Sequence, residues 1–187
     1  RPVGKQDHYA ASFGGLNYFR FYKDENTKVH NIKLSNKNKN YLENSMIVFW
    51  TGIQRLSWKI LNDQNKRHLE NTASLNKIKN HAAELKNLLK EKNISIEKIG
   101  NLINEGWKEK KTLSKNITNK FLNNAFSKGM QNGAYGGRIF GAGGGGFMMF
   151  IVKPQYHKKV IRNVQKLGLK KFDLSFGDKG SALLINL

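Results

Sequence analysis

Apolar residues return every three or four positions between residues 75 and 89, and this spacing predicts an amphipathic helix with one buried face. Shorter stretches with the same period predict further helices, over residues 56–61, 96–103, 117–126 and about 155–167. Ser95 is a candidate N-cap for one of them, and Gly129 and Gly168 are expected to end the last two. The middle of the chain is therefore predicted to be mainly helical.

Strands are predicted where apolar residues run continuously or alternate with polar ones. These stretches are 16–22, 29–34, 46–50, 147–152, about 171–176 and about 182–186. The first two pair as a hairpin across the polar turn 23–27, after a short helix over 6–13, and the basic residues 35–40 are interpreted as a linker. The order of elements predicts an α+β fold, with a mostly antiparallel sheet and helices on one face.

The chain is strongly basic, with a net charge of +20 over 187 residues. A charge of this sign attracts nucleic acid, anionic membranes or phosphorylated substrates. However, the lysines are spread along the whole chain among many asparagines, and aromatic residues do not alternate with them as in an RNA-recognition signature. Solvated Lys- and Asn-rich faces explain most of the charge. We therefore do not expect a nucleic-acid partner, and a basic nucleic-acid-binding module is the alternative interpretation.

Cysteine is absent, which excludes disulfides and thiolate metal sites and is typical of a reducing compartment. The five histidines show no metal-ligand spacing, so we expect no metal site from them. Neither a run of 18 apolar residues nor a signal peptide is visible, and we expect a cytoplasmic protein without a membrane partner. The chain opens at Arg1 without a methionine, as expected of a fragment or a processed half.

The stretch 136–152 contains seven glycines and ends in a six-residue apolar run. It holds a G-x-G-x-x-G pattern at Gly141, Gly143 and Gly146. A dinucleotide fingerprint requires a helix after this pattern, whereas the apolar run 147–152 is typical of a buried strand. The Gly-Lys-Ser/Thr sequence of a Walker loop is also missing. Two interpretations stay open: successive bare N–H groups that bind phosphate, or a plain turn between two core strands.

Two further segments are candidates for chemistry. Asp7 stands near a predicted helix start with glycines on both sides, so its carboxylate is either a general base or a helix cap. The segment 51–55 follows a predicted strand and opens a helix, and it ends in Arg55. N–H groups at a helix start and a nearby arginine suit an anionic ligand, although an ordinary strand-to-helix turn with a surface arginine explains them equally well.

Together these stretches resemble the GHMP sugar kinases, a family that includes galactokinase, homoserine kinase and mevalonate kinase. Residues 141–147 are similar to the family's glycine-rich third signature, and residues 4–15 are similar to its catalytic-aspartate segment. Segments 6–15, 51–55 and 133–138 resemble the branch that phosphorylates D-glycero-D-manno-heptose 7-phosphate at C1. The resemblance runs over essentially the whole chain.

The resemblance implies an ATP-dependent sugar kinase that phosphorylates the anomeric hydroxyl of a heptose 7-phosphate or a similar sugar. Asp7 would orient or deprotonate that hydroxyl. The phosphate or nucleotide loop would comprise Gly141, Gly143, Gly144 and Gly145. Charge and placement make Arg55, with Lys5 or Arg138, a candidate for neutralising the substrate's own phosphate. The remaining candidate substrate-binding residues are Gly14, Gly15, Thr51 and Gly52.

The resemblance also implies ATP and Mg²⁺, but the main site for both is expected in an earlier half of the kinase. That half carries a Pro-x-x-x-Gly-Leu-x-Ser-Ser loop, which is absent from residues 1–187. We expect residues 1–44 to be the remnant of an N-terminal kinase domain, residues 45–187 to be the C-terminal domain, and the N-terminal half to be a partner. The alternatives are the nucleic-acid-binding module, a non-catalytic half that needs a partner chain, and a galactokinase- or mevalonate-kinase-like member with another substrate.

Overall fold

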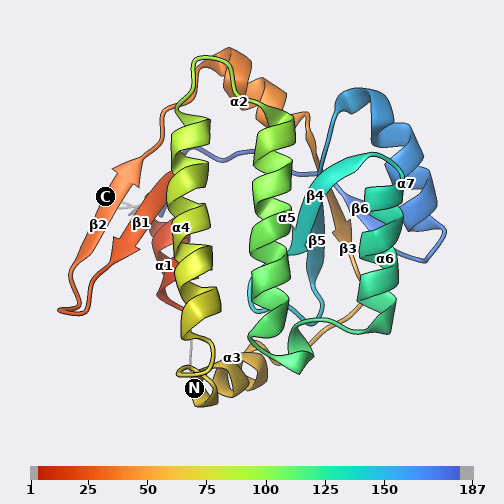
Figure 1. The fold of residues 1–187 in the computed structure, drawn as a ribbon. Coiled ribbons are helices and arrows are strands. Elements are labelled where there is room, and N and C mark those ends of the chain that lie inside the picture. The colour runs from red at the N-terminus through yellow and green to blue at the C-terminus, as the bar shows by residue number, and fades with distance from the viewer. Residues whose placement is uncertain (1–3, 182–187) are drawn as a thin grey trace, which may run out of the picture.

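A four-stranded sheet forms the centre of the structure, a computed structural model that describes residues 4–181 (Figure 1). Its strands, in spatial order, are β4 (Ala134–Ile139), β5 (Phe147–Val152), β3 (Met46–Trp50) and β6 (Lys170–Phe172). Every neighbouring pair in this sheet is antiparallel. The antiparallel sheet predicted from the order of elements is therefore confirmed.

The position of β5 explains why residues 147–152 form a continuous apolar run. Its even-numbered residues from 148 to 152 are buried in one hydrophobic core, and residues 149 and 151 are buried in a second. Side chains along a strand point alternately to the two faces of a sheet, so a strand covered on both faces needs apolar residues throughout. Phe150 packs edge-on against Phe49 of β3, with 6.1 Å between the ring centroids.

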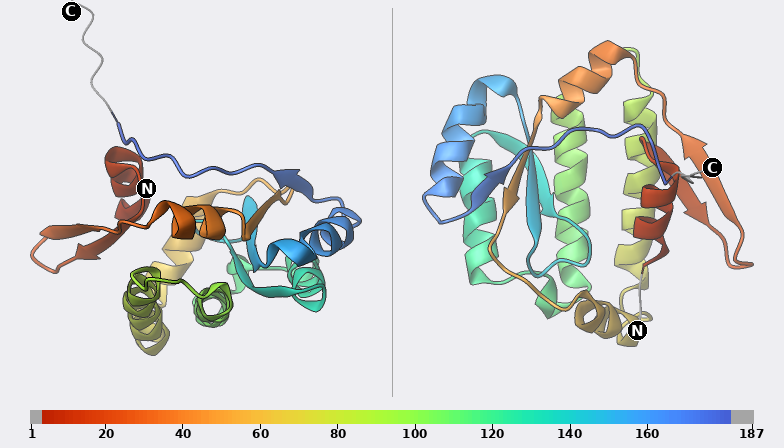
Figure 2. Two further views of the ribbon diagram at one scale, coloured as in Figure 1. Left: turned by 90° about the horizontal axis from the view of Figure 1, so that it is seen from above. Right: turned by 180° about the vertical axis from the view of Figure 1, so that it is seen from behind.

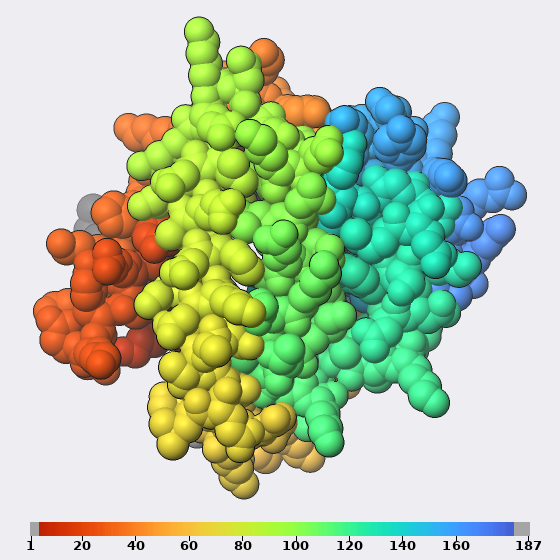
Figure 3. Space-filling view, in the orientation of Figure 1, coloured from red at the N-terminus to blue at the C-terminus, as the bar shows by residue number. Residues whose placement is uncertain are grey.

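Helices cover both faces of the sheet, so the predicted placement of the helices on one face is wrong. α4 (Thr72–Leu89) packs on α5 (Ile96–Thr112), and both α5 and α6 (Lys120–Gln131) pack on β4. α7 (His157–Gln165) contacts α6 and β6. Seen from above in Figure 2, α5 and α6 lie on either side of β4. A Cβ atom at Gly100 of α5 would lie 3.2 Å from Ile151, whereas one at Gly129 of α6 would lie 2.2 Å from the Phe150 ring, and neighbouring residues of a strand point to opposite faces. In the space-filling view, α4, α5 and α6 lie side by side on one surface of the molecule (Figure 3).

The N-terminal elements form a second, smaller sheet beside α4 (Figure 1). β1 (Asn17–Phe21) and β2 (Thr27–Asn31) are an antiparallel hairpin, which confirms the prediction. α1 (Lys5–Phe13) packs on this hairpin through Tyr9, whose ring centroid lies 5.7 Å from that of Phe19 and 5.2 Å from that of Phe21. The remaining elements are α3 (Ser57–Lys66) and two short 3₁₀ helices, η1 (Lys115–Ile117) and η2 (Pro154–Tyr156).

The linker predicted over residues 35–40 is wrong, because this segment begins the helix α2 (Asn36–Glu43). The Ser35 hydroxyl accepts a hydrogen bond from the Asn38 N–H at 3.2 Å and so caps the helix. The buried Asn38 amide donates to two main-chain carbonyls, those of Glu91 and Lys92. The polar composition of residues 35–40 suggested exposure to solvent. The Asn38 side chain is instead buried by its hydrogen bonds to the connection between α4 and α5.

Two helix ends differ in detail from the prediction. Gly129 does not end a helix, because α6 continues to Gln131. Glycine is needed at this position for another reason: a Cβ atom there would lie 2.2 Å from the Phe150 ring. α7 ends at Gln165, and Gly168 then adopts a left-handed φ of 89°. β6 is shorter than the predicted strand 171–176, and the strand predicted over 182–186 lies outside the described residues.

Two glycines on α5 provide a matched test of how closely the helix packs on the sheet. A Cβ atom at Gly100 would lie 2.5 Å from Tyr135 Cβ, whereas one at Gly106 would meet only His81 Nδ1, at 3.7 Å. We expect Gly100→Ala to lower the free energy of unfolding by about 1–3 kcal/mol because the helix must move away from β4. Gly106→Ala should be neutral or stabilising by up to about 1 kcal/mol through helix propensity. Urea unfolding of both variants measures the difference, and equal effects would contradict the close contact.

Candidate functional site

The glycine loop, residues 141–146, turns the chain from β4 into β5 and is bonded to the protein on two sides. The Gly144 N–H donates to the Ile117 carbonyl at 2.7 Å, and the Gly146 N–H donates to the Ile53 carbonyl at 2.9 Å. The buried Thr51 donates both its N–H and its hydroxyl to the Gly146 carbonyl, at 2.9 and 2.8 Å. These bonds fix the loop against the segments that follow β3 and α5.

Glycine is required in this loop because other parts of the chain come very close to it. A Cβ atom would lie 2.9 Å from the Ile117 carbonyl oxygen at Gly143, and 2.7 Å from the Ile53 carbonyl oxygen at Gly145. The loop glycines at 141 and 143–146 also have positive φ angles. On this side of the loop, the group that approaches the glycines closely is therefore the protein's own backbone.

Three cations gather at the loop. Arg55, between β3 and α3, donates its Nε–H to the Gly143 carbonyl, and the Lys110 ammonium on α5 donates to the Gly141 carbonyl. Burial, together with the positive charges of Arg138 and Arg55, lowers the pKa of Lys110 to about 8. Burial also lowers the pKa of both guanidinium groups, which nevertheless keep their charge. Three partly buried positive charges in one place favour an anionic ligand.

Asp7 faces these cations from α1. With Lys110, Gly141 and Ala142 it lines a cleft of about 690 Å³, whose apolar wall includes Trp58. The negative charge of Asp7 acts on Lys110 in the direction that raises its pKa, so the carboxylate and the ammonium lie within electrostatic reach. The N-cap of α1 is Gly4, and Asp7 lies in the first turn of the helix. The cap interpretation of Asp7 is therefore wrong.

A C-terminal strap, residues 173–181, holds α1 in place. It crosses from the edge strand β6 to the N-terminal elements on the side of the molecule away from α4–α6 (Figure 2). The Gly15 N–H donates to the Gly177 carbonyl at 2.9 Å, and the Ser181 N–H donates to the Ala11 carbonyl at 3.1 Å. A Cβ atom at Gly14 would lie 2.2 Å from the main-chain nitrogen of Gly180. Gly14 and Gly15, predicted to bind substrate, therefore contact the strap.

The other predicted substrate-binding residues fall into two groups. Arg55 and Arg138 lie with the glycine loop and Lys110, as described above. Lys5 lines the cleft but forms an exposed ion pair with Glu25, and Gly52 has a positive φ of 74° with open space at the position of a Cβ atom. Thr51 binds the loop carbonyl rather than facing the cleft.

Lys110 was missed by the sequence analysis, although the sequence carries a signal for it. The buried face of α5 includes Ile99, Leu102 and Trp107, and Lys110 follows Trp107 by three positions. Residues three apart on a helix lie on the same face. A lysine that continues an apolar stripe is expected to be partly buried, and partly buried cations are commonly found at binding sites.

Metal-binding and membrane-spanning features were also sought over residues 4–181. In this part of the chain, no group of three or more His, Cys, Asp or Glu side chains is arranged to hold a metal ion. Of the helices it contains, none is both long and apolar enough to cross a membrane.

Comparison with known proteins gives one family. Residues 79–169 match the family model described as GHMP kinases C terminal. The chain is 31% identical over 180 residues to a Campylobacter jejuni protein named D-glycero-alpha-D-manno-heptose 7-phosphate kinase. The match covers 95% of this chain and 52% of that protein, so the chain spans about half the length of this relative.

Solved structures agree with the sequence comparison. A D-glycero-D-manno-heptose 1-phosphate kinase from Bacteroides thetaiotaomicron superimposes with a TM-score of 0.68 and 26% identity, over 96% of this chain and 48% of that one. A proposed sugar kinase from Campylobacter jejuni gives a TM-score of 0.69 and 29% identity, over 95% and 50% of the two chains. The fold of this chain is thus that of about half of each structure.

The glycine loop offers a matched test of its own packing. A Cβ atom at Gly144 would lie 2.9 Å from the Asn116 carbonyl oxygen, whereas one at Gly146 would meet only the end of the Arg55 side chain, at 4.0 Å. Both glycines have positive φ, so Gly146→Ala measures the conformational strain alone, about 1 kcal/mol. We expect Gly144→Ala to destabilise the protein by at least about 1 kcal/mol more in urea unfolding. Equal losses would show that η1 does not restrict the loop.

The lowered pKa of Lys110 predicts a pH-dependent stability. Between the folded pKa of about 8 and the unfolded value of 10.5, the unfolded chain binds more protons, so stability rises with pH across this window. Lys110→Met removes this rise, on the order of 1–3 kcal/mol in the unfolding free energy. Urea unfolding at pH 7, 8, 9 and 10 would measure it. Lys108→Met, on the exposed side of α5, should keep the wild-type profile, and parallel profiles for Lys110→Met and wild type would contradict the prediction.

Proposed function

We propose that this chain, which is similar to the C-terminal part of the GHMP kinases, forms the acceptor-orienting part of an ATP-dependent sugar kinase. The observation that carries the proposal is a convergence in space. Asp7, Lys110 and Gly141 come from distant parts of the sequence and line one cleft, and Arg55 and Arg138 lie within electrostatic reach of Lys110. A carboxylate facing several cations is the arrangement that phosphoryl transfer to a hydroxyl requires.

The substrate we propose is a heptose phosphate, with its anomeric hydroxyl as the acceptor. This proposal is supported by the names of the relatives from Campylobacter jejuni and Bacteroides thetaiotaomicron, which both include a heptose phosphate. It is also supported by the charge of the site, because an acceptor that already carries a phosphate needs cations besides those that act on the donor.

In the proposed reaction, the carboxylate of Asp7 holds the acceptor hydroxyl and accepts its proton as the hydroxyl oxygen attacks the γ-phosphorus of ATP. A new phosphorus–oxygen bond to the sugar forms as the bond from the γ-phosphorus to the bridging oxygen breaks, and ADP leaves with those electrons. The contribution of Asp7 is positioning and general-base catalysis, which is typically worth 10²–10⁴-fold. The cations hold the negative charge of the phosphates, a contribution that is mainly electrostatic.

We place the main sites for ATP and Mg²⁺ in an N-terminal half that pairs with this chain. The relatives are about twice as long as this chain, which supports such a half. Residues 1–44 would belong to that N-terminal domain, and residues 45–187 would be the C-terminal domain. The boundary is supported by the two-stranded sheet of β1 and β2, which is separate from the four-stranded sheet and carries α1.

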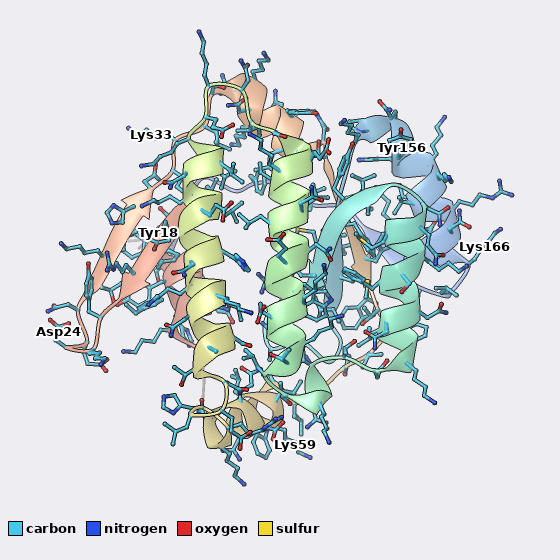
Figure 4. All side chains as sticks on the ribbon, in the orientation of Figure 1. Tyr18, Asp24, Lys33, Lys59, Tyr156 and Lys166 are labelled. Carbon is cyan, nitrogen blue, oxygen red and sulfur yellow. The ribbon has the colours of Figure 1, made fainter. Side chains whose placement is uncertain are left out.

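The kinase interpretation is favoured over a nucleic-acid-binding module. The family match and the solved structures are all of kinase type. The positive charge is also distributed rather than gathered in one groove: Lys33, Lys59 and Lys166 project from three different edges of the molecule (Figure 4). A general excess of surface lysine therefore explains the +20 charge better than a nucleic-acid-binding face does.

Replacing Asp7 tests the proposed mechanism. In the full-length kinase that contains this chain, Asp7→Asn should lower kcat by roughly 10²-fold or more, because the amide cannot accept the hydroxyl proton. The measurement is ADP release with ATP and D-glycero-D-manno-heptose 7-phosphate. Asp173→Asn, an exposed residue on the strap, serves as the matched control and should leave kcat unchanged. Near-normal turnover of the Asp7→Asn enzyme would remove Asp7 from the mechanism.

A further inference from the structure

Lys110 is a partly buried ammonium group whose surroundings disfavour its positive charge. It belongs to none of the motifs found in the sequence. We propose that Lys110, with Arg55 and Arg138, forms a subsite for a phosphate monoester dianion, and that Lys110 takes up a proton when this phosphate binds. The identity of the ligand as a substrate phosphate rests on the proposed function. The subsite and its coupling to a proton rest on the contacts described below.

The three cations share one short stretch of backbone. Lys110 reaches the Gly141 carbonyl from α5, and Arg55 reaches the Gly143 carbonyl from the segment after β3. The Arg55 Nη2 atom lies 3.5 Å from the position of a Cβ atom at Gly141, so its guanidinium extends along the loop toward Lys110. Arg138 is the last residue but one of β4, three residues before the loop, and lies within electrostatic reach of Lys110. Lys110 and Arg55 are therefore held by carbonyls of the loop, with Arg138 close to Lys110.

The cluster has an excess of positive charge that a dianion would balance. None of the ion pairs formed within residues 4–181 includes Lys110, Arg55 or Arg138. The charged groups that act on Lys110 are Arg138 from β4, Arg55 from the segment after β3, and Asp7 from α1. Three positive charges against one carboxylate leave two in excess. A phosphate monoester carries about two negative charges above its second pKa of about 6.

Lysine differs from the two arginines because its charge responds to the ligand. Burial and the neighbouring guanidinium groups lower its pKa to about 8, so at pH 8 roughly half of the unliganded protein carries a neutral amine there. A bound dianion favours the charged form and raises the pKa again. At pH 8 a phosphate monoester is already almost fully the dianion, so its binding must then draw about half a proton from the buffer.

The cleft also places this subsite beside Asp7. Lys110, Gly141 and Asp7 all line it, and its apolar wall of Phe21, Trp58 and Leu61 suits the carbon skeleton of a sugar. A phosphate held at Lys110 would thus leave the rest of the molecule over the apolar wall and within reach of Asp7. The same chemistry would serve a phosphate of the nucleotide, so the experiment has to distinguish the two sources.

Titration calorimetry at pH 8, in buffers with different ionisation enthalpies, measures both affinity and proton uptake on the 187-residue chain. The probes are inorganic phosphate, mannose 6-phosphate, mannose and ATP, all at the same ionic strength. For wild-type protein we expect phosphate binding with uptake of about half a proton. Lys110→Arg should bind with no uptake, because arginine stays charged. Lys110→Met should bind at least tenfold more weakly, and Lys108→Met should match wild type in both respects.

If mannose 6-phosphate binds with the same proton uptake and mannose causes none, the result supports the subsite as the one that binds the acceptor's phosphate. The same linkage with ATP alone also supports the subsite and assigns it to the donor. Proton uptake that persists in Lys110→Arg, or phosphate affinity unchanged in Lys110→Met, would overturn the proposal. Binding does not require turnover. A full-length protein that lacks kinase activity but keeps proton-linked phosphate binding would therefore refute the proposed function and leave the subsite intact.

Discussion

The bonding of the glycine loop to the rest of the chain is the constraint on which the candidate site depends. The N–H groups of Gly144 and Gly146 are bonded to Ile117 and Ile53, and Thr51 binds the Gly146 carbonyl. These contacts bring the segment after β3 and the segment after α5 to the same six residues. Arg55 belongs to the segment after β3 and Lys110 to the last turn of α5, so the position of both cations is tied to the backbone path of the loop. Glycine is needed there because carbonyl oxygens approach within less than 3 Å of where a Cβ atom would stand.

This arrangement has an electrostatic cost that indicates its purpose. Burial lowers the pKa of all three cations, and the charges of Arg138 and Arg55 lower that of Lys110 further. Within residues 4–181, Asp7 is the carboxylate that acts on Lys110 in the opposite direction. A protein selected for stability alone would place an apolar residue at position 110, because it continues the buried stripe of α5. Lysine at that position is explained by binding of an anion, since a bound dianion would compensate the repulsion and part of the desolvation.

The C-terminal strap has a comparable role for Asp7. α1 contributes no buried residues, and apart from the strap it is held by its aromatic contacts with the hairpin and by the exposed Lys5–Glu25 ion pair. The strap adds main-chain bonds to Gly15 and Ala11, and Lys39 pairs with Asp178 at 2.6 Å. The strap starts at the edge strand of the main sheet and ends on the helix that carries Asp7. The carboxylate and the cations are therefore fixed to one framework although they belong to the two ends of the fold.

The sequence by itself determined most of the elements and the family. Periodicity found α4, α5 and α6 because each buries one face, and a continuous apolar run found β5 because both of its faces are covered. The motifs around Asp7 and the glycine loop identified the GHMP kinases, and Arg55 and Arg138 were placed near a phosphate from their charge. Composition misplaced α2, because a run of asparagine and lysine gives no sign that Asn38 binds two distant carbonyls.

Only the tertiary structure decided that Gly14 and Gly15 pack against the strap and that Lys110 completes the cation cluster. Those roles depend on contacts between segments far apart in the chain, and local patterns of residues carry no record of which distant segment will come to lie beside them.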